Sequence, residues 1–141
     1  MKPAILLDAG PLVAFFREGD ANHDWALAQF AEPGALPFLS CDAVVAEASY
    51  LLRRERPGGW GVLELAAKGA LRLPFAIGEH AEEISRLMRK YADVPMSLAD
   101  ACLVRMAELY PDSAILTLDR DFRLYRKHGR RALPLIMPSG L

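Results

Sequence analysis

Short, continuous apolar runs alternate along this chain with longer segments in which apolar residues recur every three or four positions. The clearest runs are Ala4 to Leu7, Ala114 to Thr117 and Leu133 to Met137. Uninterrupted runs of this length are typical of strands buried on both faces of a parallel sheet. Because parallel strands are joined by crossover helices, the alternation predicts an α/β fold in which helices flank a mainly parallel central sheet.

The segments between these runs fit the same pattern. Two further short strands are expected at residues 36–39, although Pro37 is unfavourable there, and at residues 71–73. One helix is predicted to follow Asp42 as its N-cap, and another to follow Ser97. A third helix is indicated by apolar residues at spacings of three and four, which are Ile84, Leu87, Met88 and Tyr91.

The length and charge of the chain limit what it does. Its 141 residues contain no repeat or long linker, so residues 1–141 are expected to form a single domain. A composition of 52% hydrophobic and 25% charged residues is that of an ordinary globular protein. The formal net charge of −1 means that any binding to nucleic acid depends on a local basic patch or on metal ions.

Several sequence features indicate the cellular compartment of the protein. Cys41 and Cys102 lie in apolar stretches without the spacing of a zinc site. Asp8 interrupts the first apolar run too early for the core of a signal peptide. No run approaches the roughly 20 apolar residues that a membrane helix needs. We therefore expect a cytoplasmic protein with reduced thiols and no membrane association.

Four acids occupy positions at which a ligand site is expected. Asp8 ends the first strand and Asp119 closely follows another, and ligands of open α/β sheets bind beyond the carboxyl ends of the strands. Glu47 and Asp100 interrupt helical stretches that are otherwise apolar. Four neighbouring carboxylates repel one another unless a cation joins them, and Mg²⁺ prefers oxygen ligands. These positions are consistent with a magnesium site.

Each acid also has a purely structural interpretation. Asp8 and Asp119 are placed to cap the helices that follow them. Ser97 and Asp100 match a capping box, and Glu47 is within reach of an ion pair with Arg53 or Arg54. From position alone both interpretations remain open.

The surroundings of the four acids carry more information than the acids alone. Each acid lies in a short motif, and the motifs span residues 6–14, 40–47, 91–101 and 116–122. The third contains an aspartate, a serine and an aspartate–alanine pair, and the fourth contains threonine-x-aspartate followed by aspartate–phenylalanine. In this order and at these separations they resemble the PIN-domain family, specifically the VapC-type toxins of bacterial and archaeal toxin–antitoxin pairs. The resemblance extends from Leu6 to about Ile136.

This resemblance implies a PIN-like three-layer sandwich and a Mg²⁺-dependent endoribonuclease. Four residues are implied as catalytic and metal-binding: Asp8, Glu47, Asp100 and Asp119. One or two Mg²⁺ ions, or Mn²⁺, would activate water and stabilise charge on the scissile phosphate. Ser97 and Thr117 are suited to orienting the carboxylates, and Asp121 is interpreted as a helix cap.

The resemblance also implies partners: an RNA substrate, a cognate antitoxin that covers the acidic cleft, and a second copy of the chain in a homodimer. The basic stretch from Arg120 to Arg131 is a candidate for holding the RNA backbone, although solvated charges on a surface helix explain it equally well. Apolar residues within 12–30 and 60–71 suit partner interfaces or the core.

Three other functions fit the sequence less well. A phosphohydrolase with Asp8 as nucleophile would favour a second acid two residues on, but that position is Gly10. A receiver domain needs a mid-chain phosphoacceptor aspartate and a lysine near the last strand, and neither is evident. The third is a catalytically silent PIN-like module that binds RNA or protein, against which the four intact acids argue.

Overall fold

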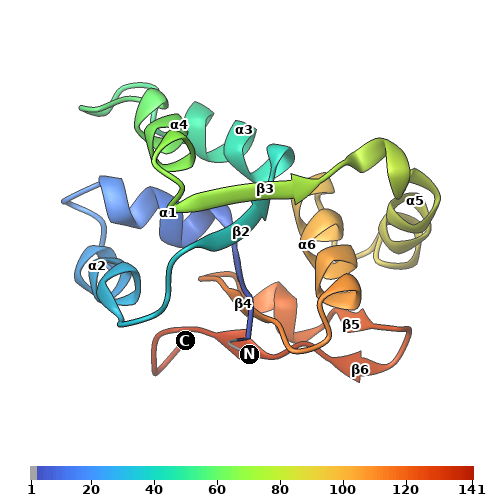
Figure 1. Ribbon diagram of the computed structural model, residues 1–141. Coiled ribbons are helices and arrows are strands. Elements are labelled where there is room, and N and C mark those ends of the chain that lie inside the picture. The colour runs from blue at the N-terminus through green and yellow to red at the C-terminus, as the bar shows by residue number, and fades with distance from the viewer. Residues whose placement is uncertain (1–2) are drawn as a thin grey trace.

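Five parallel strands form the central sheet of the computed structural model, which describes residues 3–141 (Figure 1). In sheet order they are β3 (Leu71–Phe75), β2 (Phe38–Cys41), β1 (Ile5–Leu7), β4 (Ala114–Leu116) and β7 (Leu135–Ile136). All four neighbouring pairs are parallel, which confirms the predicted mainly parallel sheet.

Helices cover the sheet and complete the α/β architecture. They are α1 (Ala9–Phe16), α2 (His23–Ala31), α3 (Asp42–Leu51), α4 (Trp60–Ala67), α5 (Ala81–Lys90) and α6 (Leu98–Leu109). Figure 1 shows α1 and α2 on one side of the sheet and α5 and α6 on the other. Helix α6 packs directly on β1, β2 and β4, and α5 packs on α6. No helix within residues 3–141 is both long enough and apolar enough to span a membrane.

The remaining elements are shorter. Two 3-10 helices, η1 (Ile77–Glu79) and η2 (Arg120–Arg123), precede α5 and follow β4 respectively. Strands β5 (Arg126–Lys127) and β6 (Arg131–Ala132) form an antiparallel hairpin beside the main sheet. The interpretation of the basic stretch as a surface helix is therefore wrong, because only its first four residues are helical.

Two helix starts and one strand start test the sequence predictions locally. Ser97 is the N-cap of α6, and its Oγ accepts a hydrogen bond from the backbone N–H of Asp100, as predicted. Asp42 is not a cap, because α3 begins at Asp42 itself and Cys41 precedes it as N-cap. Strand β2 begins only after Pro37, at Phe38, whose N–H donates to the carbonyl of Ala70 at 3.0 Å. Proline has no N–H to donate to such a ladder.

The apolar runs of the sequence form the centre of the core. Leu6 and Leu7 of β1 are fully buried, as are Ile115 and Leu116 of β4. Burying a large aliphatic side chain contributes roughly 1.5–3 kcal/mol to folding, so these strands are strongly fixed in register. Leu7 pairs with Leu116, and the N–H of Asp8 donates to the carbonyl of Leu116 at 3.0 Å. The residues that follow β1 and β4 are thereby held side by side at one edge of the sheet.

Candidate active site

The four predicted acids line one open cavity of about 710 Å³ at the carboxyl edge of the sheet. Asp8 follows β1, Glu47 lies on α3, Asp100 lies in the first turn of α6, and Asp119 follows β4. They come from four parts of the chain, and the fold brings all of them together. Ser97, Arg120 and Asp121 line the same cavity.

Asp8 is the most buried of the four acids, with a relative exposure of 6%. Its Oδ1 accepts a hydrogen bond from the N–H of Ala9 at 2.8 Å, and its Oδ2 accepts one from the Thr117 hydroxyl at 2.6 Å. Burial raises the pKa of Asp8 to about 7 in spite of these bonds, and repulsion from Asp100 and Glu47 adds to the rise. Asp8 is therefore the N-cap of α1, which confirms the helix-cap interpretation, and it also faces the other acids.

Thr117 connects Asp8 to the segment that carries Asp119. Its fully buried Oγ1 donates to Asp8 and accepts from the N–H of Asp119 at 3.0 Å. Asp119 in turn is the N-cap of η2, and its Oδ1 accepts from the N–H of Asp121 at 2.8 Å. The interpretation of Asp121 as the cap is wrong, because Asp121 lies one residue inside η2 and Asp119 takes that position.

Asp100 is held from two sides. Ser97 caps the helix turn in which it lies, and the Tyr125 hydroxyl donates to its Oδ2 at 2.8 Å. Burial raises the pKa of Asp100, while the hydrogen bonds from Tyr125 and Ser97 oppose the rise. The pKa of Tyr125 is also raised, first by its burial and then by its bond to Asp100, so it remains a donor.

Tyr125 is the site residue that the sequence did not identify. It is fully buried and bonded to a site acid. A tyrosine three residues after an Asp-Phe pair (Asp121, Phe122) gives no local signal for this contact, since 25 residues separate it from Asp100. Only the path of the chain after η2 places it there.

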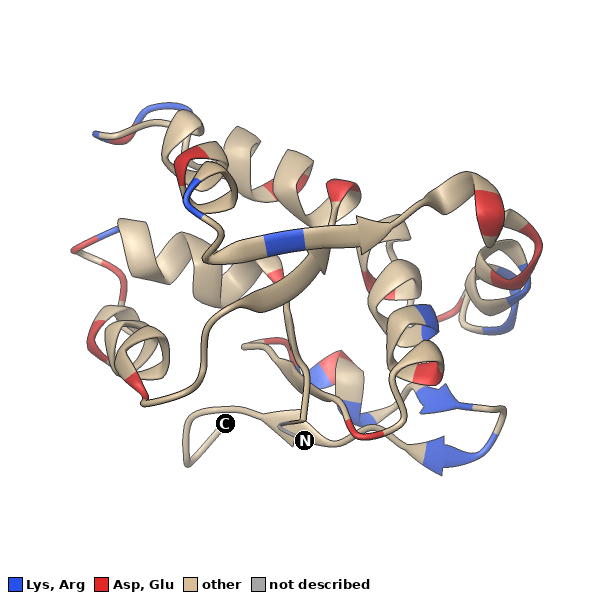
Figure 2. Cartoon of the chain, in the orientation of Figure 1, with Lys and Arg blue, Asp and Glu red and all other residues tan. Residues whose placement is uncertain are grey.

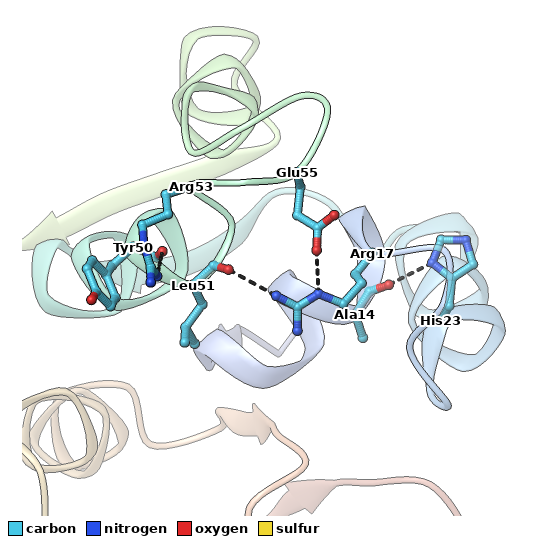
Figure 3. A network of polar contacts seen from close by, with 7 residues as sticks. All are labelled: Ala14, Arg17, His23, Tyr50, Leu51, Arg53 and Glu55. Carbon is cyan, nitrogen blue, oxygen red and sulfur yellow. Dashed lines mark hydrogen bonds and ion pairs between the residues drawn. The ribbon is translucent and has the colours of Figure 1, made fainter.

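Glu47 differs from the other acids because its side chain is exposed at the cavity. The ion pair suggested with Arg53 or Arg54 is not formed within residues 3–141. The guanidinium of Arg53 lies 3.9 Å from the centre of the Tyr50 ring and donates to the Tyr50 carbonyl (Figure 3). Partial burial raises the pKa of Glu47, and repulsion from Asp100 and Asp119 raises it further.

A polar network fixes the wall of the cavity beside Glu47 (Figure 3). Arg17, which ends α1, donates through Nε to Glu55 at 2.7 Å and through Nη2 to the carbonyl of Leu51 at 2.9 Å. Leu51 is the last residue of α3 and lines the cavity. Ring nitrogen Nδ1 of His23 lies 2.7 Å from the carbonyl of Ala14 and so fastens α2 to α1.

The donor set fits a hard divalent cation. All four acids offer carboxylate oxygens, and the raised pKa values of Asp8, Glu47 and Asp100 reflect partly buried charges that an ion would neutralise. Within residues 3–141, no group of three or more acid, histidine or cysteine side chains is arranged so that it could hold a metal ion. Mg²⁺ keeps several waters and commonly uses one or two carboxylates, so an open cavity of this kind suits it better than zinc.

The basic stretch does not form one continuous patch. Arg120 is exposed and lines the cavity, but Lys127 is buried and directed to the carbonyl of Pro111. Arg123 donates to the carbonyl of Leu141, and Arg126 donates to two nearby carbonyls. Figure 2 shows basic residues on β5, β6, α5 and α6, and others on β3 and in the loop between α3 and α4.

Comparisons with known proteins assign this chain to a family. The PIN domain profile matches residues 5–128, and the chain belongs to the PIN domain family. It is 31% identical over 118 residues to Ribonuclease VapC26 of Mycobacterium tuberculosis, an alignment covering 82% of this chain and 87% of the relative.

A solved structure shows the same fold. The crystal structure of VapC20 of Mycobacterium tuberculosis, a toxin that cleaves the sarcin–ricin loop, superposes with a TM-score of 0.77. The superposition covers 91% of this chain and 99% of VapC20, at 19% sequence identity. The predicted α/β sandwich and the predicted family are thus both confirmed.

Proposed function

We propose that this protein is a Mg²⁺-dependent endoribonuclease of the VapC toxin type, acting in the cytoplasm as one PIN domain over residues 1–141. Asp8, Glu47, Asp100 and Asp119 are its metal-binding and catalytic residues, with Mn²⁺ as an alternative ion. The observation that carries the proposal is the convergence of these four carboxylates on one cavity. Similarity to a named ribonuclease over most of the chain supports the reaction.

The burial and hydrogen bonding of each acid indicate its role in the reaction. When bound, a divalent ion supplies an activated water and neutralises charge on the phosphate and the leaving oxygen. Asp8 and Asp100 are buried and hydrogen-bonded, so they hold fixed positions as ligands. Glu47 is exposed and its carboxylate makes no hydrogen bond to another described residue, and its raised pKa suits it to accept a proton from water.

Two further groups complete the proposed site. Asp119 faces Glu47 and Asp100 and is fixed through its bond to the N–H of Asp121. Arg120, exposed at the edge of the cavity, is placed to pair with the scissile phosphate of RNA. A cation of this kind offsets the repulsion between an acidic cavity and a polyanionic substrate.

The proposal includes a cognate antitoxin and a homodimer as partners. Within the segments expected to form interfaces, Leu12 and Val13 belong to the core, whereas Leu27 of α2 and Trp60 and Leu63 of α4 are exposed. Large exposed apolar side chains on α2 and α4 support partner binding at these helices. Measurement of molar mass in solution, with and without the antitoxin, tests both partners.

The test is cleavage of labelled RNA by the purified chain with Mg²⁺, with Mn²⁺ and with EDTA. Asp8→Asn and Asp100→Asn variants run beside the wild type, and Asp24→Asn, an exposed acid on α2, is the matched control. Metal-dependent cleavage that is lost in the first two variants and kept in the control supports the proposal. Cleavage that survives EDTA and both variants contradicts it, and RNA binding without any cleavage favours the silent binding module.

A further inference from the structure

A second cavity, of about 290 Å³, lies between α5, α6 and the turn of the β5–β6 hairpin. It shares no lining residue with the acidic cavity. Three cationic side chains from two helices line it, Arg86 and Lys90 of α5 and Arg105 of α6, together with His128 of the hairpin turn. Sequence analysis did not connect these residues, because they come from three separate segments.

One of the two acids in this second cavity, Glu108, is hydrogen-bonded to both α6 and the hairpin turn. Oε1 of Glu108 accepts from Nη1 of Arg105 at 3.1 Å, and its Oε2 accepts from the backbone N–H of His128 at 2.7 Å. Glu83 also lines the cavity, so three cations face two acids. Arg130 and Arg131, both exposed in the adjoining hairpin, raise the positive charge around it.

The hairpin turn is held in an unusual conformation beside these cations. His128 has a φ of 51°, the one positive φ of a non-glycine residue within residues 3–141, and Gly129 follows with a φ of 81°. A non-glycine residue is uncommon in this region and persists where its surroundings fix it. Glu108 fixes the turn from α6, and Nζ of Lys90 donates to the carbonyl of Gly129 at 3.0 Å from α5. Lys90 and Arg105, whose Nε also donates to Nδ1 of His80 at 3.2 Å, are therefore held in place, whereas Arg86 is exposed beside them.

The second cavity and the acidic one share a helix. Arg105 is five residues after Asp100 on α6, which is about 7.5 Å along the helix axis and roughly 140° around it. Lys90 adjoins Tyr91, whose ring centre lies 5.1 Å from that of Tyr125, the donor to Asp100. The rise per nucleotide of a strand in a double helix is roughly 3.4 Å, so the axial part of this separation alone corresponds to about two stacked nucleotides.

We propose that Arg86, Lys90 and Arg105 bind a backbone phosphate of the RNA strand a few nucleotides from the scissile bond. The inference rests on the proposed ribonuclease function. A phosphate is the anion that suits a cavity with guanidinium and ammonium donors from two helices. The site would hold the strand and set the minimum length of a good substrate, without touching the reacting atoms.

The test separates this phosphate contact from the chemistry. Arg86→Gln/Lys90→Gln is compared with Arg89→Gln/Lys68→Gln, which removes the same charge from the other face of α5 and from the end of α4. Binding of single-stranded RNA is measured by fluorescence anisotropy over a range of salt, with Asp8→Asn present in both proteins so that RNA is not cut. We expect the slope of log K against log salt to shrink by about 0.7 for the first pair only, as for one lost phosphate contact.

Kinetics with Asp8 intact supply the second arm. We expect Arg86→Gln/Lys90→Gln to raise KM for a long RNA, with kcat unchanged and with no effect on cleavage of a dinucleotide. An unchanged salt slope, an equal change in the matched control, or a loss confined to antitoxin binding would overturn the phosphate site while wild-type cleavage stands. Absence of wild-type cleavage would instead count against the proposed function, and absence of any RNA binding would overturn both.

Discussion

The Tyr125 hydroxyl donates a 2.8 Å hydrogen bond to Oδ2 of Asp100, joining the aromatic core to a site acid. The Tyr125 ring is fully buried and packs edge-on against both Phe122 and Tyr91. Because the ring cannot move without disturbing this cluster, the orientation of the Asp100 carboxylate depends on packing below the cavity. A residue that never touches RNA is therefore expected to affect the reaction.

Tyr125→Phe tests this dependence. The substitution removes a donor that lowers the pKa of Asp100, so the pKa of Asp100 should rise further. We expect the acidic limb of the pH–rate profile to move to higher pH and the free energy of unfolding to fall by about 1.5–3 kcal/mol, the value of a hydrogen bond to a charged group. Measurements are the pH dependence of kcat/KM and urea unfolding.

Tyr91→Phe is the matched control for that experiment. The Tyr91 hydroxyl accepts from the N–H of Arg126 at 3.0 Å and has no bond to a site acid. Its loss should lower stability without moving the pH–rate profile. If both variants shift the profile equally, Tyr125 acts through general packing rather than through Asp100.

Thr117→Val tests the connection between Asp8 and Asp119. Valine preserves the shape but removes the oxygen that donates to Asp8 and accepts from Asp119. Outer hydrogen-bond partners of metal ligands are commonly worth about 10- to 100-fold in metal affinity or activity, and we expect a loss of that size. Thr117→Ser retains the hydroxyl and should restore most of the activity. The measurements are the Mg²⁺ concentration at half-maximal rate and kcat, and a serine variant as defective as the valine one would contradict the hydroxyl's role.

The pKa of Asp8 predicts an unusual pH dependence of stability in metal-free protein. An acid whose pKa is about 7 when folded and 3.8 when unfolded holds its proton more tightly in the folded state. Folding is therefore unpenalised below about pH 3.8 and loses stability as the pH rises toward 7. The full loss is about 4 kcal/mol as an upper limit, and Glu47 and Asp100 act in the same direction.

Asp8→Asn removes that penalty and should make the metal-free protein more stable than wild type above pH 7, although inactive. Urea unfolding in EDTA across this pH range measures the effect. The matched control is Asp24→Asn, an exposed acid, which should leave the profile unchanged. Equal stability of wild type and Asp8→Asn at every pH would show that Asp8 is not destabilised by burial.

Added metal should reverse the same penalty. Mg²⁺ binds the ionised carboxylates, so it should stabilise the wild type above pH 7 and lose its effect as Asp8 takes up a proton at lower pH. At a concentration of about 100 times Kd the stabilisation is about 2.7 kcal/mol. Thermal unfolding with and without Mg²⁺ measures it, and an equal effect of Mg²⁺ on Asp8→Asn would argue against metal binding at this residue.

The sequence predicted the sheet well because its central strands are short apolar runs with no competing interpretation. Leu6, Leu7, Ile115 and Leu116 have the composition of doubly buried strands, and the structure buries all four. The acids next to β1 and β4 followed from the rule that parallel strands end at one edge. The predictions of individual helix caps were wrong at two positions. Asp42 and Asp121 were both predicted as caps, but a nearby residue takes the cap position in each case. Several polar residues in a row satisfy the same cap pattern, and only backbone geometry chooses among them.

Contacts across the chain were not predictable. The bonds from Tyr125 to Asp100 and from Thr117 to Asp8 span 25 and 109 residues, and no spacing in the sequence indicates them. The same holds for the second cavity, because its cations lie on α5, α6 and a hairpin that was interpreted as a helix. Thr117 was singled out by family resemblance, whereas nothing in the residues around Tyr125 set it apart from an ordinary core aromatic.

A pair of buried serines gives a test of the structure beside the site. Ser40 on β2 donates to the carbonyl of Leu7 at 2.7 Å and so ties β2 to the end of β1, directly before Asp8. Ser113 is equally buried, but its Oγ has no hydrogen-bond partner among the described residues. Ser40→Ala removes this buried hydrogen bond and should cost about 0.5–1.5 kcal/mol, whereas Ser113→Ala removes an unpaired hydroxyl and should be neutral or stabilising. The chemical change is identical in the two variants, so urea unfolding of both isolates the value of the hydrogen bond. Equal destabilisation would show that Ser40 does not secure the strand that presents Asp8.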